Sequence, residues 1–383
     1  MRFASSWRAP SISEPPDVPA KRLPRIGIVI HDFALGGTER IAVRLAAAWI
    51  DLGAEVEIFC GSEHGPIREL LDPRVTVAVA TRPISRALWS VPKLAAAAAR
   101  HYARHQVDGL FVPGNFHWPV VAAIAALPAA TRPRIIAQIS SALEKDQRGA
   151  VRQRLFERRM RGELAGADVV VALAGETADV ARRILSRPVE TIALPVLADA
   201  ADVPCPLPPG PPLILAAGRF VAQKDFVTLV EAFALLDHPA ATLVIVGDGP
   251  QMQRVRARVK TLGIGGRVTL AGYAPDIRPW LDQARLFVLS SRHEGYAAVI
   301  VEALAAGRPV VATDCTPAAA ELIDSPEVGM VVPIGDPSAL AEAMRAMLDR
   351  PAPDPQALAR RVDRFRIGPI ARAYFDLFEL AGR

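Results

Sequence analysis

Two acidic residues flank the start of an apolar segment in the second half of the chain. Glu294 lies in a polar stretch after a strand-like run that ends near Ser290, and Glu302 is the only charge in the helix-like run that starts near Ala297. An ionised carboxylate among apolar side chains costs several kcal/mol unless it is paired or faces water. Glu302 is therefore either the one polar side of an otherwise buried helix or a carboxylate that binds ligand hydroxyls.

The beginning of this predicted helix also offers main-chain groups. The first amides of a helix, here those of about Tyr296 to Val299, have no partner within the helix and suit phosphate oxygens. A carboxylate beside a phosphate would repel it, so we expect Glu294 to face an uncharged part of the same ligand, such as a sugar hydroxyl. The alternative is structural, because an acid ahead of a helix is stabilised by the helix dipole.

Two basic residues follow another strand-like run. Gly218 ends the run LILAAG, and Arg219 and Lys224 flank the loop before a helix predicted to start near Asp225. A lysine at the amino terminus of a helix is unfavourable by ~0.3–1 kcal/mol unless an anion lies there. The pair therefore predicts a diphosphate site, and a pair of solvated surface bases is the alternative.

A glycine pair follows the first strand-like run of the chain. Gly36 and Gly37 lie between this run and the first predicted helix. Glycine at such a place permits a sharp turn or a close approach of the backbone to a ligand. An ordinary strand–helix turn would look the same. The sequence VGDGP at 246–250 is a comparable loop in the second half.

The elements that must position these residues alternate along the chain. Short runs that are apolar throughout are separated by Ala-rich amphipathic stretches long enough for helices, as in ERIAVRLAAAWIDLG and DFVTLVEAFALL. Fully apolar strands separated by helices indicate parallel sheets that are covered on both faces. The expected fold is α/β, with two doubly wound domains. In such sheets ligands bind beyond the carboxyl ends of the strands, where the residues above are located.

Length and composition agree with two globular domains. The chain has 383 residues, more than the ~250–300 at which one core usually stops growing. With 51% hydrophobic and 22% charged residues it is not a disordered protein. Its apolar runs are shorter than the ~20 residues that span a membrane. The expected divisions are a disordered tail (1–23), a first Rossmann-like domain (24–195), a Pro-rich linker (196–212), a second Rossmann-like domain (213–366) and a terminal helix (367–383).

The cysteines and the charge balance bear on location. Cys60, Cys205 and Cys315 are scattered and form no C-x-x-C pair, so neither a disulfide framework nor a thiolate zinc site is expected and a reducing cytosol fits. The first residues lack the apolar core of a secretory signal. The net charge of +5 permits an anionic ligand or membrane surface without requiring one.

An arginine-rich stretch lies in the first half. Residues 145–166 form a predicted helix that includes Arg154, Arg158 and Arg159. This is either a solvated basic face or a surface that leans toward anionic lipid headgroups or a lipid-diphosphate acceptor. Nucleic acid is not expected, because no stacking aromatic residues accompany the bases.

The motifs coincide in the order found in one enzyme family. GGTER, GRF-x3-K, VGDGP, RVTLAGY and EGYAAVIVEALAAGRPVVATD follow one another, and the last contains an E-x7-E pattern formed by Glu294 and Glu302. The chain resembles the retaining, nucleotide-sugar-dependent glycosyltransferases of family four, which have the GT-B fold of two Rossmann-like domains facing across a cleft. The resemblance covers about residues 25–380 and is strongest in the second half.

The resemblance implies roles for the charged side chains. Arg219 and Lys224 would hold the donor diphosphate and stabilise the leaving nucleotide. Glu302 would bind the ribose hydroxyls, and Glu294 the hydroxyls of the transferred sugar. Arg219, Lys224 and Glu294 are thus the implied catalytic residues.

The resemblance also implies donor contacts from the backbone. Amides after Glu294 would help to place sugar and phosphate, the backbone near Tyr273 would meet the base, and Gly37 would approach the diphosphate from the first domain. The implied donor-binding residues besides Glu302 are Gly36, Gly37, Gly218, Tyr273, Gly295, Tyr296 and Ala297.

The implied reaction moves a sugar from a UDP- or GDP-sugar to a saccharide or lipid-linked acceptor, in cell-envelope or exopolysaccharide synthesis. The nucleotide sugar is a substrate, no cofactor is expected, and no metal is expected because no D-x-D motif is present. The helix around Tyr374 resembles the family's segment that crosses back onto the first domain. Two alternatives on the same fold are a non-catalytic nucleotide-sugar-binding protein and a nucleotide-sugar 2-epimerase.

The sequence departs from the family pattern in three places. Many members carry a sugar-contacting histidine after the fifth strand of the first domain, where this chain has Ser140 and Ser141. His117 lies one strand earlier and either compensates or is a loop histidine near Trp118. Ala297 stands where Gly or Pro is usual, and the Gly-rich turn common after VVATD is absent.

Overall fold

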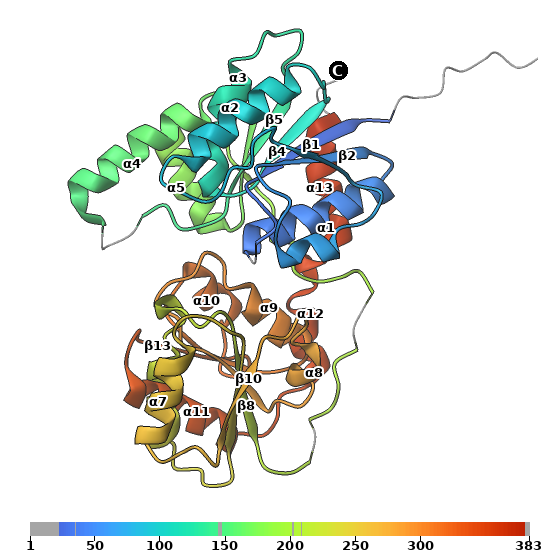
Figure 1. Ribbon diagram of the computed structural model, residues 1–383. Helices are drawn as coiled ribbons and strands as arrows, with labels where there is room; N and C mark the ends of the chain where they lie inside the picture. The colour runs from blue at the N-terminus through green and yellow to red at the C-terminus, as the bar shows by residue number, and fades with distance from the viewer. Residues whose placement is uncertain (1–22, 35, 145–147, 201–202, 208, 380–383) are drawn as a thin grey trace, which may run out of the picture.

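The computed structural model describes residues 23–379, apart from residues 35, 145–147, 201–202 and 208. Within these residues the chain forms two α/β domains, one above the other in Figure 1. The tail expected at 1–23 lies outside the described residues except for Leu23. The described helices include none that is long and apolar enough to cross a membrane.

The first domain is built on a parallel sheet in the order β3-β2-β1-β4-β5-β6-β7. Six of its strands are the apolar runs expected from the sequence. The seventh strand, Glu190–Thr191, was not expected. It has only two residues, both exposed and neither apolar. The strands are β1 (Arg25–Ile30), β2 (Glu55–Cys60), β3 (Thr76–Val79), β4 (Gly109–Val112), β5 (Arg134–Ile139), β6 (Val169–Ala172) and β7 (Glu190–Thr191).

The second domain repeats the plan with a parallel sheet in the order β10-β9-β8-β11-β12-β13. All six strands coincide with the apolar runs of the second half. Both strand orders reverse direction once, which defines a doubly wound sheet. The strands are β8 (Leu213–Ala217), β9 (Thr242–Val246), β10 (Val268–Gly272), β11 (Leu286–Leu289), β12 (Val310–Thr313) and β13 (Gly329–Val332).

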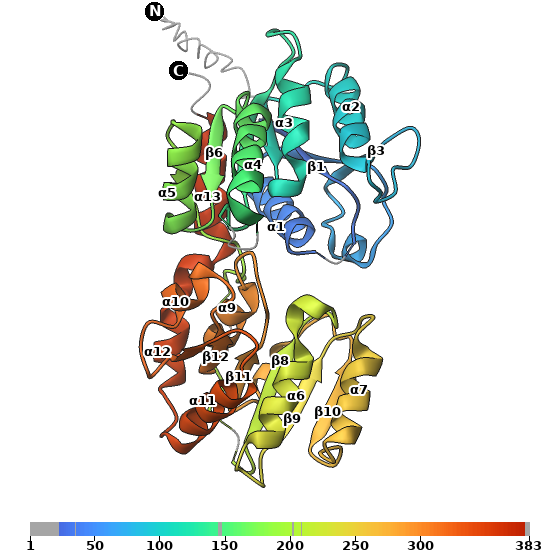
Figure 2. The ribbon, with the colours of Figure 1, turned by 90° about the vertical axis from the view of Figure 1, so that its left-hand side faces the viewer.

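Helices cover both faces of each sheet, as the apolar strands require (Figure 2). In the first domain they are α1 (Gly37–Asp51), α2 (Ser90–Tyr102), α3 (Trp118–Ala125), α4 (Gly149–Leu164) and α5 (Gly175–Leu185). The later ones are α6 (Phe226–Leu235), α7 (Met252–Thr261), α8 (Arg278–Leu281), α9 (Ala298–Ala305), α10 (Pro317–Leu322), α11 (Pro337–Asp349), α12 (Pro355–Arg360) and α13 (Ile367–Glu379). Short 3-10 turns occur at η1 (Pro66–Leu70), η2 (Asn115–His117), η4 (Ala222–Lys224) and η5 (Asp363–Phe365).

The last helix leaves the second domain and packs on the first. Figure 1 shows α13, in red, beside the blue α1. The fully buried Trp49 of α1 donates its indole N–H to the carbonyl of Ala371 at 3.0 Å. Its ring lies 5.6 Å edge-on from Phe378 and 6.3 Å from Tyr374. The core of the first domain is therefore completed by the end of the chain.

Two chain crossings join the domains, and they lie side by side. Leu197 and Arg366 form a parallel bridge, with the Ile367 amide donating to the Leu197 carbonyl at 2.9 Å. The Gly368 amide donates to the Asp199 carboxylate at 2.7 Å. The Pro-rich stretch is also held to the second domain, since Arg308 donates to the carbonyl of Cys205 at 3.0 Å. The expected linker is thus held at its start and near its middle.

Candidate active site

The candidate site lies where the strand order of the second sheet reverses. β8 and β11 are neighbours at this point, while the chain leaves them in opposite directions around the sheet. Their carboxyl ends open a crevice between the two following loops, the usual ligand position in doubly wound sheets. One loop carries Arg219 and Lys224 and the other carries Glu294, so the structure brings together two segments that are 70 residues apart.

The loop after β8 is held by backbone crossings that only glycine allows. Gly218 has φ +152° and Gly247 has φ +139°, values that side chains rarely adopt. A Cβ on Gly247 would collide with the carbonyl of Gly218. A Cβ on Gly218 would lie 2.9 Å from Cε of Lys224, so the lysine side chain runs directly over this glycine. The glycines therefore set the position of the Lys224 ammonium.

Lys224 and Glu294 form an ion pair. Nζ of Lys224 lies 2.6 Å from Oε1 of Glu294, and Oγ of Ser291 donates to the same oxygen at 2.6 Å. The side chains are only 17% and 11% exposed. The sequence interpretation gave these residues to different parts of a ligand, the lysine to phosphate and the glutamate to sugar. In the ligand-free structure each neutralises the other.

Arg219 differs from Lys224. Its side chain is exposed, and among the described residues no hydrogen bond or ion pair is found for its guanidinium. The backbone around it is fixed, because the neighbouring Phe220 amide donates to the carbonyl of Asp248 at 2.8 Å. Within six residues of chain, the loop thus carries Lys224, which is ion-paired, and Arg219, whose guanidinium has no partner among the described residues.

The loop after β11 turns into α9 through a strained residue. Ala297 caps α9 with φ 57° and ψ 53°, a left-handed conformation that costs an alanine about 1–2 kcal/mol. Tyr296 turns its ring inward, 5.7 Å from Phe365, and burial raises the pKa of its hydroxyl. Of these two residues, therefore, the main chain rather than the side chains faces the crevice.

Glu302 lies one turn into α9 and faces the other domain. Burial raises the pKa of its carboxyl, while Arg44 and Arg40 of α1 act in the opposite direction. Arg44 also donates to the carbonyl of Val196 at the domain crossing. Glu302 is partly exposed and its carboxyl is opposite two arginines, an arrangement that both interpretations of this residue allow.

A cavity of about 740 Å³ opens beside Glu302 between the domains. Arg40 and Arg44 line it on one side, and residues 274–278 line it on the other. Tyr273, which is 51% exposed, directly precedes this second wall. The volume of this cavity is in the range of small-molecule sites.

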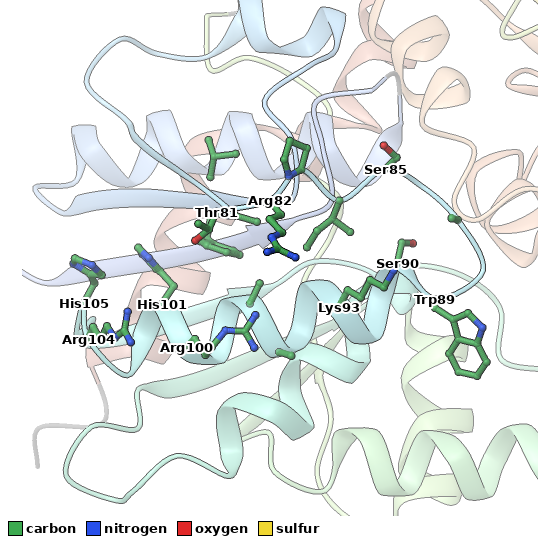
Figure 3. Close-up of a pocket in the computed structure, with 18 of the residues that line it drawn as sticks. Thr81, Arg82, Ser85, Trp89, Ser90, Lys93, Arg100, His101, Arg104 and His105 are labelled. Carbon is green, nitrogen blue, oxygen red and sulfur yellow. The ribbon is translucent and has the colours of Figure 1, made fainter.

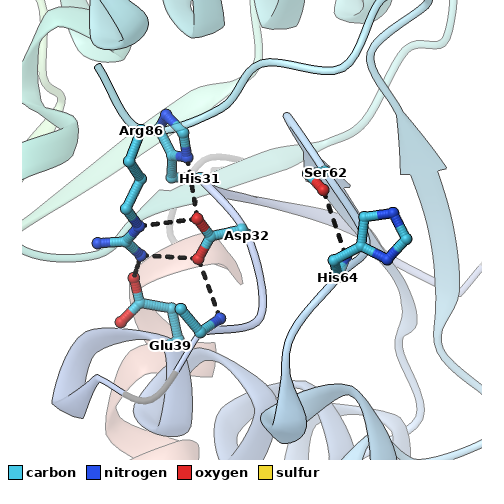
Figure 4. Close-up of polar contacts among 7 residues, drawn as sticks. His31, Asp32, Glu39, Ser62, His64 and Arg86 are labelled. Atoms are coloured by element: carbon cyan, nitrogen blue, oxygen red, sulfur yellow. Dashed lines mark hydrogen bonds and ion pairs between the residues drawn. The ribbon is translucent and has the colours of Figure 1, made fainter. Parts of the chain in front are cut away.

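The opposing face of the first domain holds an ion network in which the two carboxylates are largely buried and Arg86 is partly exposed (Figure 4). Arg86 donates to both carboxylate oxygens of Asp32, at 2.7 and 2.8 Å, and to Glu39 at 2.5 Å. Burial alone would raise the pKa of Asp32. The hydrogen bonds from Arg86 and from the Ala34 amide outweigh it and hold that pKa at about 2. His31 Nδ1 lies 3.2 Å from the same carboxylate.

The glycine pair after β1 divides into two environments. A Cβ on Gly36 would collide with the Glu39 carboxylate, so this glycine makes room for the ion network. Gly37 is exposed, and a Cβ there would meet nothing within 4 Å. Gly37 alone therefore presents open backbone at the start of α1.

His117 is a buried residue at the end of the η2 turn, between β4 and α3. Its Nδ1 accordingly donates to the Pro113 carbonyl at 2.7 Å, and burial lowers its pKa to about 4, so the ring is neutral at pH 7. Its ring contacts Phe116 at 5.4 Å, edge-on. Nε2 has no partner among the described residues. His117 thus lies in a turn next to Trp118, as one of the two interpretations expected, but its ring packs against Phe116 and no ring contact with Trp118 is found among the described residues.

Ser140 lies where the loop after β5 of the first domain meets the loop before α9 of the second. Its amide donates to Oδ1 of Asn115 at 2.7 Å, which fixes the loop after β5. A Cβ on Gly295 would lie 2.8 Å from the carbonyl oxygen of Ser140. The Glu294–Ala297 loop thus passes directly under the first domain, and only a glycine fits at 295 without displacing one of the domains.

Sequence reasoning missed three charged residues. Asp32 and Arg44 flank the glycine pair that the sequence did single out, so their position along the chain was a signal. Arg86 comes from a loop with no motif and reaches the site only through the fold. No group of three or more His, Cys, Asp or Glu residues that could hold a metal ion occurs within the described part of the chain.

The architecture matches solved structures along nearly the whole chain. Anabaena HepE, solved in complex with UDP and glucose, superposes with a TM-score of 0.75 at 18% identity, over 93% of this chain and 100% of that one. Two doubly wound domains that face each other across a site at the carboxyl ends of their strands form the GT-B fold.

Family comparisons divide the chain at the same place. Residues 35–196 match the model described as Glycosyltransferase Family 4, and residues 211–350 match the model described as Glycosyl transferases group 1. The chain therefore belongs to the family-four glycosyltransferases.

Curated relatives act in several glycan pathways. The lipopolysaccharide core biosynthesis glycosyltransferase LpsE of Rhizobium meliloti is 38% identical over 141 residues, 37% of this chain and 41% of LpsE. The 2-deoxystreptamine N-acetyl-D-glucosaminyltransferase of Streptomyces fradiae is 27% identical over 349 residues, 81% of this chain and 82% of that enzyme. The chain spans less than half the length of LpsE and of several other curated relatives that it matches.

Proposed function

We propose that this protein is a retaining glycosyltransferase that moves a sugar from a UDP- or GDP-sugar to a saccharide or lipid-linked acceptor. The observation that carries the proposal is the convergence of Lys224 and Glu294, 2.6 Å apart, at the strand-order reversal of the second sheet and under the first domain. The UDP complex of HepE and the lipopolysaccharide role of LpsE support the substrate classes and a place in envelope or exopolysaccharide synthesis.

In this proposal the donor replaces the internal ion pair. The diphosphate takes the Lys224 ammonium, with Arg219 as the second cation. Glu294 is thereby released to accept hydrogen bonds from hydroxyls of the transferred sugar. The amides at the start of α9 add donors for the phosphate, with the helix dipole in the favourable direction.

The nucleoside half of the donor occupies the cavity beside Glu302. A carboxylate opposite Arg44 accepts hydrogen bonds from ribose hydroxyls while its charge is balanced by that arginine. The base lies along residues 273–278, which form the opposite wall of the cavity. Gly37 contributes open backbone from the first domain.

The chemistry then depends on the leaving group. The bond between the anomeric carbon and the phosphate oxygen breaks, and a bond from the acceptor oxygen to that carbon forms on the same face. The acceptor proton passes to an oxygen of the departing diphosphate. Lys224 and Arg219 stabilise the charge that develops on the diphosphate, which is the task a divalent ion would otherwise have. We therefore propose a metal-independent reaction.

A panel of nucleotide sugars tests the proposal. Release of UDP or GDP in the presence of saccharide acceptors is the expected result, and the anomeric configuration of the product, read by proton NMR, tests retention. Equal rates with and without EDTA are expected. An isomerised donor would instead identify an epimerase, and binding without turnover a nucleotide-sugar-binding protein. Either of these outcomes would overturn the transferase.

We also propose a cytoplasmic location on an anionic membrane surface, through α4. Val151 and Leu155, one turn apart, are 72% and 63% exposed beside the exposed arginines Arg154 and Arg158. Apolar and basic side chains on one exposed helix suit a lipid interface. The three free cysteines accord with a reducing compartment.

Vesicle flotation checks the membrane contact. Binding should require phosphatidylglycerol and should be lost in the double variant Arg154→Glu, Arg158→Glu. The matched control is Arg256→Glu, Lys260→Glu on α7, which reverses the same number of exposed charges at the same spacing. Equal binding by both double variants would refute this contact.

A further inference from the structure

A groove of about 1160 Å³ runs along α2 of the first domain (Figure 3), and it shares no lining residue with the cavity beside Glu302. One wall is α2 itself and the other is the segment 79–89 that follows β3. None of the residues assigned to the donor lines it. The reaction proposed above therefore gives this groove no task.

The groove is strongly basic. The groove is lined by exposed side chains of Arg82 from the loop, Lys93 and Arg100 from α2, and Arg104 just beyond α2. In the described part of the chain none of these four has a side-chain hydrogen bond or an ion pair, and no carboxylate lines the groove. Arg100 in the last turn of α2 and Arg104 just after the helix carry like charges, which repel each other in the groove. An anion bound in the groove would relieve this repulsion.

Its shape favours an extended molecule. Lys93 and Arg104 are 11 residues apart on or just beyond α2, which corresponds to ~16 Å along a helix axis. The cations line a hollow between two walls, whereas a bilayer would meet a flat or convex face. At one end Trp89 is 68% exposed and Leu88 91% exposed. The indole offers a flat apolar ring with a hydrogen-bond donor beside the row of charges.

One end of the groove adjoins the cleft. Ser85 and Trp89 mark this end in Figure 3, and Arg86 between them belongs to the network with Asp32 and Glu39. From there α2 runs away from the second domain to His105, which stacks on His101 at 4.6 Å. An acceptor whose terminal sugar enters the cleft would thus have the rest of its chain directed along the groove.

We infer that the groove along α2 binds the anionic chain of the acceptor, a saccharide that carries phosphate or uronate groups behind the sugar that receives the transfer. The inference deepens the proposed function and rests on it. The basic side chains hold the acidic groups, and Trp89 covers a sugar ring near the cleft. The groove then selects acidic glycans over neutral ones, independently of the donor.

Calorimetric titration of the full chain without lipid tests the inference. The probes are a sulfated heparin pentasaccharide, an oligogalacturonate and the neutral maltopentaose. We expect salt-dependent binding of both acidic probes and none of the neutral one. The double variant Lys93→Glu, Arg100→Glu should bind the acidic probes at least about tenfold more weakly. Arg256→Glu, Lys260→Glu on α7, with the same change in charge, should bind them like the parent.

A second readout places the ligand in the groove. The acidic probes should change the tryptophan emission of the parent but not that of Trp89→Phe. Equal losses in the two double variants would mean that only net charge matters, and unchanged binding in the α2 variant would exclude the groove. Groove-dependent binding to phosphatidylglycerol vesicles, without binding of the oligosaccharides, would make it a membrane contact and overturn the inference.

UDP titration of the same variants separates this inference from the proposed function. The α2 variant should bind UDP like the parent, because no groove residue lies in the donor site. If neither protein binds UDP or GDP or turns over any donor, the proposed function fails whatever the acidic probes do. If donor turnover is intact but the acidic probes ignore the groove, the inference alone fails.

Discussion

The two faces of the cleft are constructed in different ways. The face on the second domain is set by backbone conformation: Gly218 and Gly247 have positive φ, and so does Ala297. The face on the first domain is set by side chains, with Arg86 joining Asp32 to Glu39. A backbone-built site is recorded in short local motifs, whereas a site built from side-chain pairs depends on residues brought together from distant segments.

This difference corresponds to the ligands proposed for each face. A nucleoside diphosphate presents the same phosphates whatever sugar it carries, and fixed amides and cations suit it. Acceptors differ from one enzyme to another, and interchangeable side chains can adapt to them. The second domain should thus lose function when charges at its loops change, and the first domain should lose stability or acceptor choice.

The largest expected effect is on the second-domain face. Lys224→Gln removes the cation held over Gly218, and turnover should fall about 10²–10³-fold, as for other groups that stabilise transition-state charge. Nucleotide release with saturating donor measures it. Lys260→Gln, an exposed lysine on α7, is the control and should keep the parent rate. Unchanged kinetics in Lys224→Gln would show that the diphosphate lies elsewhere.

A smaller effect is expected at Glu302. Glu302→Gln should weaken UDP binding about 10–100-fold, since hydrogen bonds to a charged group contribute about 1.5–3 kcal/mol. Because burial raises the pKa of Glu302, UDP affinity of the parent should also decline as the pH is lowered toward that pKa. The variant should lose this dependence. Its free energy of unfolding at pH 7 should not decrease, as a desolvated charge is removed. Titration calorimetry with UDP from pH 5 to 8, on the parent and on Glu302→Gln, measures both the affinity and its pH dependence.

On the first-domain face, changing the ion network should alter the free energy of unfolding. The low pKa of Asp32, about 2 against an ordinary 3.8, stabilises the fold above pH 4, and this contribution is lost as the pH falls toward 2. Because Arg86 is 46% exposed, we expect a contribution of about 1–2 kcal/mol rather than the full shift. Arg86→Ala should therefore lower the free energy of unfolding at pH 6, with the difference from the parent vanishing near pH 2.

Urea unfolding at several pH values checks this expectation, with Arg256→Ala on α7 as the control. A constant difference between Arg86→Ala and the parent across the range would mean that packing and not the charge of Asp32 is responsible. It would also weaken the contrast between the faces.

The smallest effect concerns the helix that joins the faces. Tyr374→Phe removes the hydroxyl that accepts from the buried amide of Gln138 at 2.8 Å. The free energy of unfolding should fall by about 1 kcal/mol, with donor binding unchanged. The exposed Tyr273→Phe is the matched control for stability. A change in UDP affinity in Tyr374→Phe would show that α13 also shapes the second-domain face.

The sequence predicted the parts of the molecule that repeat a local pattern. Apolar runs identified all six strands of the second sheet, because a parallel strand is buried on both faces and needs no partner residue to be recognised. The loop after β8 was found from Gly218 and the charges beside it, and the turn before α9 from the polar stretch with Glu294 that follows a strand-like run. The terminal helix was expected from the apolar face around Tyr374.

Pairings across the fold could not be predicted in the same way. The contact of Lys224 with Glu294 was missed because each residue was assigned separately to a ligand, and nothing local to either shows that the two loops meet. Arg86 lies in a loop without a motif and becomes significant only beside Asp32. The basic groove depends on α2 facing Arg82, which is a matter of packing.

The contact of Trp49 with the last helix has a consequence for how the protein is made. Its indole lies in the first quarter of the chain, and its partners Ala371 and Phe378 are among the last residues described. During synthesis the leading Rossmann unit keeps the apolar surface around Trp49 uncovered until the α13 segment has left the ribosome. Severing the chain between the two sheets would therefore not yield two independent pieces, and the half that begins the chain would be the one to aggregate.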